Sequence, residues 1–346
     1  MLATAVPTLT PVPKTETPVS KTDWYRELGT YEKPDLGRAI WQLVDTLVPF
    51  LGLWVLMAYM LQHQVSYALV FPLVVVAAAL QIRIFIFFHD CTHGSFFASR
   101  RANQILGYVT GIICYTPYDE WRHTHAVHHA TAGDLDRRGL GDIETLTVQE
   151  YRQASSWKQF TYRLTRNPAF LLAIGAPLLF IVLHRLPRAG AGRREALSVW
   201  YTDAAMAVVI VFLSWTIGLG PFLLIQLPMA IIAAAGGVWF FYVQHQFDGV
   251  YWARHENWDY FKAALEGSSY YKLPLVLQWI SGNIGFHHIH HLKPRIANYH
   301  LPQCYENIPA LQTVKPLTLR TSLKSLSLNL WDEENQRMVG FKEARG

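Results

Sequence analysis

Three short segments of this 346-residue chain concentrate its histidines. Imidazoles three or four positions apart lie on one face of a helix, so each segment would present its side chains to a common point. The segments "HDCTH", "HAVHH" and "HHIHH" supply His89 and His93, then His125, His128 and His129, then His287, His290 and His291. We therefore treat these eight residues as candidate metal ligands.

A ninth candidate, His245, follows a long apolar stretch in "FYVQHQFD". Because one zinc ion takes about four ligands, nine imidazoles exceed one metal and suit two, with four or five nitrogens each. All-nitrogen sites suit zinc, copper, iron or nickel, whereas magnesium and calcium prefer oxygen. A single HxxxH pair is as readily explained by packing, but three convergent clusters favour a two-metal site.

The other histidines have simpler interpretations. His123 and His288 point away from the ligand faces, so we expect packing or outer hydrogen-bond roles for them. A metal-bound histidine normally donates its second N–H to a carboxylate or carbonyl. Candidates for such outer partners are Asp90, Asp142, Asp248 and Asn283. Asn283 lies four residues before His287 and would hold a metal-bound water; a turn or cap role after Gly282 explains it equally well.

The elements that position these residues are apolar. The chain is 51% hydrophobic and 16% charged, against about 25% charged in a typical soluble domain. Five apolar stretches cover residues 39–61, 66–88, 168–183, 200–220 and 221–243. Crossing a bilayer takes about 20 helical residues, which four of the five reach. The composition and these lengths predict an all-α integral membrane protein.

The distribution of basic residues predicts the topology. The turns within the pairs 39–88 and 200–243 lack Lys and Arg, whereas the segment 89–199 is rich in both, so that side is expected to be cytoplasmic. Keeping all histidine clusters on this side requires 104–118 and 168–183 to be interfacial or partly inserted helices. We expect four transmembrane helices in two hairpins and a cytoplasmic helical cap from residues 89–199 and 244–346. Six spans are the alternative.

The whole of 36–346 then forms one membrane domain, and the Thr/Pro/Lys-rich residues 1–35 are expected to be a disordered tail. Both termini would be cytoplasmic. The net charge of +5 is explained by the basic cytoplasmic side, so no nucleic-acid partner is expected. Cys91, Cys114 and Cys304 form no CxxC or disulfide spacing.

The order HxxxH, HxxHH, HxxHH between paired spans resembles the membrane-bound fatty acid desaturases. Outside the histidine boxes, "FIFFHDCTHGSFF", "YRLTRNP", "YVQHQFDGVYW", "ALEGSSYYKLP" and "GNIGFHHIHHLKPRIANYHL" are most similar to bacterial acyl-lipid desaturases of the Bacillus type. The resemblance extends over about residues 40–340. It implies an enzyme with a non-haem centre of two iron ions, O2 as co-substrate, and a cis double bond formed in an acyl chain of a membrane lipid.

The same resemblance implies that the eight box histidines and His245 are the iron ligands, and that the protein resides in the cell's inner (plasma) membrane. No fused cytochrome b5 motif is present, so the electron donor would be a separate ferredoxin, flavodoxin or cytochrome b5 type protein. The stearoyl-CoA type carries an Asn one turn before the extra histidine, where this chain has Phe241.

Two other functions fit parts of the pattern. A hydroxylase or ketolase of the same superfamily, acting on an alkane, sterol or carotenoid, would use the same histidine boxes. A transporter or haem-insertion factor would instead place histidines inside the spans, facing a pore.

Overall fold

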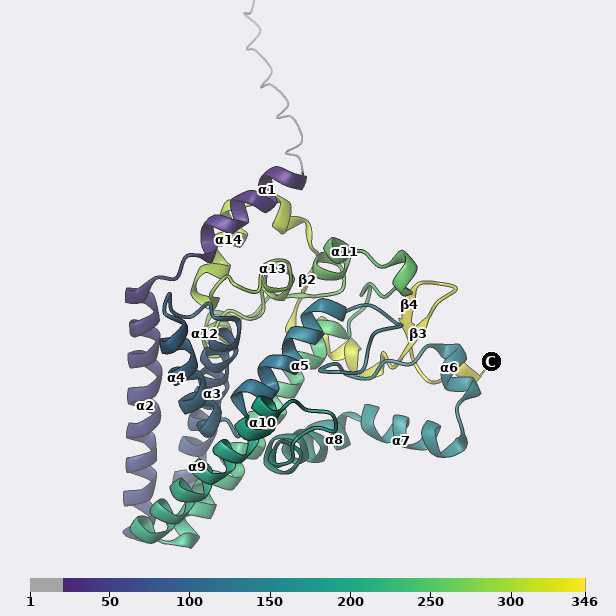
Figure 1. Cartoon of the computed structure of the whole chain (residues 1–346). Coiled ribbons are helices and arrows are strands. Elements are labelled where there is room, and N and C mark those ends of the chain that lie inside the picture. The colour runs from purple at the N-terminus through teal and green to yellow at the C-terminus, as the bar shows by residue number, and fades with distance from the viewer. Residues whose placement is uncertain (1–20, 346) are drawn as a thin grey trace, which may run out of the picture.

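The computed structural model describes residues 21–345, which are mostly helical. Four long helices form two antiparallel hairpins: α2 (Leu36–Gln62) with α3 (Tyr67–His93), and α9 (Arg193–Ile217) with α10 (Leu219–His245). Both hairpin turns lie at the same end of the molecule (Figure 1), where the Tyr67 hydroxyl donates to the Leu224 carbonyl at 3.0 Å. Consequently α3 and α10 both end, at His93 and His245, on the opposite side.

The long helices carry a surface suited to lipid. Large apolar side chains such as Val55 of α2 and Trp215 of α9 are 71% and 84% exposed. Soluble proteins rarely expose continuous apolar surface of this extent, so a bilayer is its natural surrounding. Asp35 caps the start of α2 by accepting from the Arg38 N–H at 3.0 Å, and Gly94, with a φ of 69°, ends α3.

A fifth apolar helix extends over Pro168–Arg185, and it too is long and apolar enough to cross a membrane. It comprises α8 (Pro168–Phe170), the π-helical η2 (Leu171–Gly175) and η3 (Leu178–Val182), and η4 (Leu183–Arg185). In Figure 1 the coil following α8 is seen nearly along its axis, whereas α2 runs down the page. This arrangement accords with an interfacial helix, and the count of four spans stays a prediction.

Two fourteen-residue helices connect the hairpins to the cap. α4 (Arg100–Ile113) packs along α3 and, with fourteen residues, is shorter than a membrane span. α5 (Tyr118–Thr131), which carries the second histidine box, packs against α9 and α3. Gly111 lets α4 approach the following turn, since a Cβ there would lie 2.5 Å from the Thr116 carbonyl oxygen.

The cap contains short elements that gather at the end of α3 and α10 (Figure 1). Its helices are α6 (Val148–Gln153), α7 (Ser156–Arg166), α11 (Tyr260–Leu265), α12 (Leu275–Ile280), α13 (His287–Leu292), α14 (Leu301–Asn307) and α15 (Leu319–Ser322). Single turns are η5 (His255–Asn257), η6 (Asn298–His300), η7 (Pro309–Thr313), η8 (Leu323–Ser327) and η9 (Glu343–Arg345). β1 (Tyr270–Tyr271) pairs in parallel with β2 (Pro316–Leu317), and β3 (Leu330–Asp332) pairs antiparallel with β4 (Arg337–Val339).

One expectation, that the whole of the N-terminal segment is disordered, is wrong. Residues 21–32, which we expected to belong to a disordered tail, form α1 (Lys21–Leu28) and η1 (Gly29–Glu32). Trp24 and Leu28 are buried in the core cluster that contains Ile289 and Leu292 of α13, and this burial stabilises the helix. Residues 1–20 lie outside the described part of the chain.

Candidate metal centre

All nine predicted histidines lie in two compact groups at the end of α3 and α10. Within each group the ligand nitrogens lie within 4.8 Å of one another. The first group contains His89, His93, His125, His129 and His290; the second contains His128, His245, His287 and His291. α5 and α13 contribute to both groups, whereas α3 serves only the first and α10 only the second.

Some ring nitrogens have more nitrogen neighbours at hydrogen-bond distance than one N–H can serve. The Nε2 atom of His129 lies 3.1 Å from that of His125 and 3.0 Å from that of His290. In the second group, the Nε2 atom of His245 lies 3.1 Å from that of His128 and 3.0 Å from that of His287. A neutral imidazole has one N–H, so an Nε2 with two such neighbours does not satisfy both.

A metal ion would resolve these contacts. Nitrogens that bind one ion at about 2.0–2.1 Å can lie about 3 Å apart, as these four pairs do. The donor set is entirely imidazole, which suits iron, zinc, copper or nickel. The two groups therefore fit two transition-metal ions.

Burial favours the neutral form of the box histidines on α5 and α13 other than His128. Eight of the nine are buried, and His93 is only partly exposed. Burial first, and the neighbouring imidazoles second, lower the pKa values of His125, His129 and His290 well below the usual range. The same two causes lower the pKa of His291. The neutral form of histidine is the one that binds metal, so the site is electrostatically prepared for it.

Outer partners orient three of the candidate ligands. His89 Nδ1 lies 3.0 Å from a carboxylate oxygen of Asp90, and His128 Nδ1 hydrogen-bonds Asp142. His245 Nδ1 lies 3.1 Å from the Gly267 carbonyl oxygen. With Nδ1 engaged, each ring turns Nε2 towards its group.

Asp248 and Asn283 have other partners. The exposed Asp248 carboxylate accepts from Lys324 Nζ at 2.7 Å. The Asn283 amide accepts from Gln278 at 3.1 Å and donates to the Asn298 carbonyl at 3.2 Å, and its φ is 61°. Asn283 thus follows Gly282 as a turn residue, the alternative to holding a metal-bound water.

The sequence analysis did not predict two of the hydrogen-bonding groups around the histidines. Asn298 donates to Asp90 from its backbone N–H at 2.7 Å and from its side chain at 2.9 Å. The partner of His245 is the backbone carbonyl of Gly267, and a backbone group is not indicated by residue type. Neither contact has a sequence signal, because the pairs are distant in the chain.

The histidines that were not predicted to be ligands lie outside both groups. His123 pairs with Glu195 at 3.2 Å on the surface, and the buried His288 packs with Nε2 3.3 Å from the Leu311 carbonyl oxygen. His184 lines the cavity described next rather than either group.

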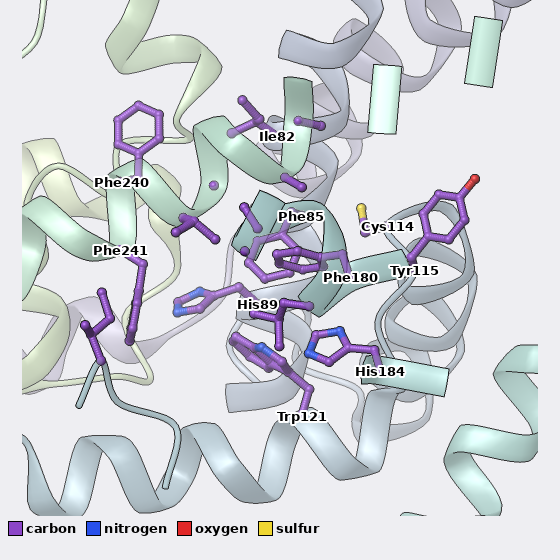
Figure 2. A pocket seen from close by; sticks show the side chains of 18 of the residues that line it. Ile82, Phe85, His89, Cys114, Tyr115, Trp121, Phe180, His184, Phe240 and Phe241 are labelled. Atoms are coloured by element: carbon purple, nitrogen blue, oxygen red, sulfur yellow. The ribbon is translucent and has the colours of Figure 1, made fainter. Parts of the chain in front are cut away.

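An apolar cavity of about 550 Å³ adjoins the histidines. His89, His125 and His287 contribute to its wall, and it continues along α3 as far as Gln81. Gln81 precedes His89 by eight residues, or about 12 Å of helix. Figure 2 shows the rings and side chains that surround this space on either side of His89: Phe85, Phe180, Trp121, Phe240, Phe241, Cys114 and Tyr115.

Two all-histidine groups that could hold metal, beside an apolar cavity in a helical protein with lipid-suited helices, are typical of membrane-bound oxidoreductases. A family model described as "Fatty acid desaturase" matches residues 65–320. The chain is 45% identical over 317 residues to a protein of Bacillus subtilis (strain 168) named "Fatty acid desaturase", covering 92% of this chain and 90% of that protein. This chain belongs to the fatty acid desaturase family, which confirms the resemblance, and it is accordingly an enzyme of the oxidoreductase class.

More distant relatives are also desaturases. The chain is 25% identical over 245 residues to the "sn-1 acyl-lipid omega-3 desaturase (ferredoxin)" of Synechocystis, covering 65% of this chain and 63% of that protein. It is 25% identical over 236 residues to the "Omega-3 fatty acid desaturase, endoplasmic reticulum" of Vigna radiata, covering 63% of this chain and 59% of that protein.

Proposed function

We propose that this enzyme uses two iron ions and O2 to introduce a cis double bond into an acyl chain of a membrane lipid. The observation that carries the proposal is the pair of all-histidine groups beside an apolar cavity, each with at least one histidine in the cavity wall. The five-histidine group would hold one ion and the four-histidine group the other. When bound, the ions would supply the activation of O2 that removes two hydrogen atoms from adjacent methylenes.

The chain's own residues would position the substrate. The apolar wall around Phe85, Phe180 and Phe241 favours a hydrocarbon chain and excludes water. His89, His125 and His287 in that wall bring the ion-binding groups beside the chain. A methylene pair held there would react in preference to the rest of the chain, since orientation alone strongly accelerates a reaction.

The reaction needs a reductant. Reducing O2 to two waters takes four electrons, of which the substrate supplies two as the double bond forms. A separate donor would supply the other two; ferredoxin is supported by the name of the Synechocystis relative, with flavodoxin or cytochrome b5 types as other donors. We place the enzyme in the inner membrane with the cap and both termini in the cytoplasm, because the basic residues gather in the cap.

Lipid analysis tests this function. The full chain would be expressed in a host with saturated acyl chains, beside His290→Ala and the exposed control His123→Ala. We expect new double bonds with the wild-type chain and His123→Ala but none with His290→Ala, as located by mass spectrometry of derivatised methyl esters. Hydroxylated or keto products would instead assign a hydroxylase or ketolase. Unchanged lipids from folded, iron-loaded protein supplied with a working donor would overturn the proposal.

A further inference from the structure

Arg166, the last residue of α7, is a buried cation without an acidic partner. The residue is 3% exposed, and among residues 21–345 no carboxylate lies within 4.0 Å of its guanidinium. The rings of Tyr162 and Tyr242 flank it, with centroids 5.3 Å and 5.7 Å away. A buried charge is costly unless its hydrogen bonds are met, so the partners of this group show what it does.

The guanidinium joins two segments that are distant in the chain. One amino group donates to the Thr145 hydroxyl at 2.9 Å and to the Glu144 carbonyl at 2.5 Å. The other donates to the Gln246 side-chain oxygen at 3.2 Å. Gln246 also donates to the Thr145 hydroxyl at 2.9 Å, which closes the network.

Both joined segments support the second histidine group. Thr145 follows Asp142, the partner of His128, by three residues. Gln246 directly follows His245 at the end of α10. The first group depends instead on Asp90 and Asn298, and neither of these residues contacts the Arg166 network.

We propose that Arg166 is a positioning residue for the second histidine group. Its planar guanidinium holds residues 142–145 against the end of α10, so that His128 and His245 keep the orientation that a metal ion needs. An arginine suits this task because its rigid, forked donors reach both segments at once, whereas a lysine offers a single nitrogen. This role rests on the proposed two-metal function, since the ion of the second group is its readout.

The test compares Arg166→Met with Arg163→Met in the full-length protein. Methionine keeps an apolar stem but removes the donors. Arg163 lies one turn earlier on α7, where it hydrogen-bonds the Tyr151 hydroxyl and stacks on Phe341, and neither partner belongs to a histidine group. Bound iron per chain would be measured during titration with a chelator, and thermal unfolding would be followed in parallel.

We expect Arg166→Met to retain one ion at wild-type affinity and to bind the other about 10–100-fold more weakly, as loss of outer support does in other metal sites. Arg163→Met should retain both. Thr145→Val, which removes the hydroxyl at the junction with little change of volume, should weaken the same ion even if Arg166→Met fails to fold.

If Arg166→Met and Thr145→Val both bind two ions at wild-type affinity, the positioning role of Arg166 is overturned. The proposed two-metal function is not affected by that result. Equal weakening of both ions would also overturn the positioning role, because the effect would then be general. A folded wild-type chain that holds fewer than two ions would overturn the two-metal function itself.

Discussion

Replacing Asp90 by Asn should weaken the first metal ion through the tautomer of His89. One carboxylate oxygen of Asp90 faces His89 Nδ1 at 3.0 Å, and the other accepts two N–H groups of Asn298 at 2.7 and 2.9 Å. When His89 binds metal through Nε2, its Nδ1–H and the two Asn298 N–H groups all donate to this carboxylate. An Asn amide offers one oxygen and one NH2 group, so the NH2 group meets a donor whichever way the amide turns.

The least costly arrangement of Asp90→Asn keeps the amide oxygen on Asn298 and turns the NH2 group towards His89. His89 Nδ1 must then accept, which moves the imidazole proton to Nε2 and removes that nitrogen from the ligand set. Loss of an outer partner typically lowers metal affinity 10–100-fold, or about 1.4–2.8 kcal/mol. If the amide oxygen instead faces His89, the two Asn298 N–H groups have no acceptor. Leaving them unpaired would lower the stability of the fold by about 1–3 kcal/mol.

The assay is a chelator titration of purified protein with iron measured per chain, beside thermal unfolding of the metal-free form. Asp90→Asn should weaken one ion about 10–100-fold and leave the other unchanged. The matched control is Asp248→Asn, because Asp248 is exposed and paired with Lys324. Wild-type affinity for both ions in Asp90→Asn would refute the reasoning, since the tautomer of His89 would then not depend on this carboxylate.

Three further outcomes are expected. Gly285→Ala should displace the third histidine box and lower the content of both ions, because its Cβ would lie 2.4 Å from the Tyr271 carbonyl oxygen; elemental analysis checks this. Gly237 lines the cavity and an added Cβ would meet nothing within 4 Å, so Gly237→Leu should shift the products towards shorter acyl chains in lipid profiles, and an unchanged profile would contradict this. Burial lowers the pKa of His288 to about 4 from 6.5, so the unfolded chain binds more protons between these values. In the metal-free protein this residue should cost about 1.4 kcal/mol of stability per pH unit below about 6.5, in addition to the loss from the other buried histidines. The slope of stability against pH should therefore fall by that amount in His288→Asn, as measured by unfolding at pH 7.5–5.

The convergence of the candidate ligands could be predicted from sequence because its signal is local. His125, His128 and His129 share a helix face by spacing alone, and the same holds for the other two boxes. The division into two groups could not be predicted this way. Adjacent residues His128 and His129 belong to different groups, since neighbouring positions on α5 point about 100° apart and α13 and α10 close the two groups from different sides.

The polar contacts around the histidines were harder to predict than the convergence of the histidines. Asp90 and Asp142 contact ligands as expected, whereas Asp248 lies near His245 in sequence but points to solvent. The prediction that residues 21–32 are disordered was wrong for a related reason. The composition of this segment is polar, and its helix depends on burying Trp24 and Leu28 against α13, a contact with a partner far along the chain.

The two groups also explain how the cap and the spans depend on each other. His129 and His290 meet across 161 residues, and His128 and His245 meet across 117. Without metal, these buried nitrogens lose hydration and gain no adequate partner, which opposes docking of α13 onto α5 and α10. An ion that binds only the docked arrangement adds its binding free energy to the stability of the fold. Removal of metal should therefore loosen α13 before it affects the hairpins, with increased hydrogen exchange in residues 285–300 while the core of α2 and α3 remains protected.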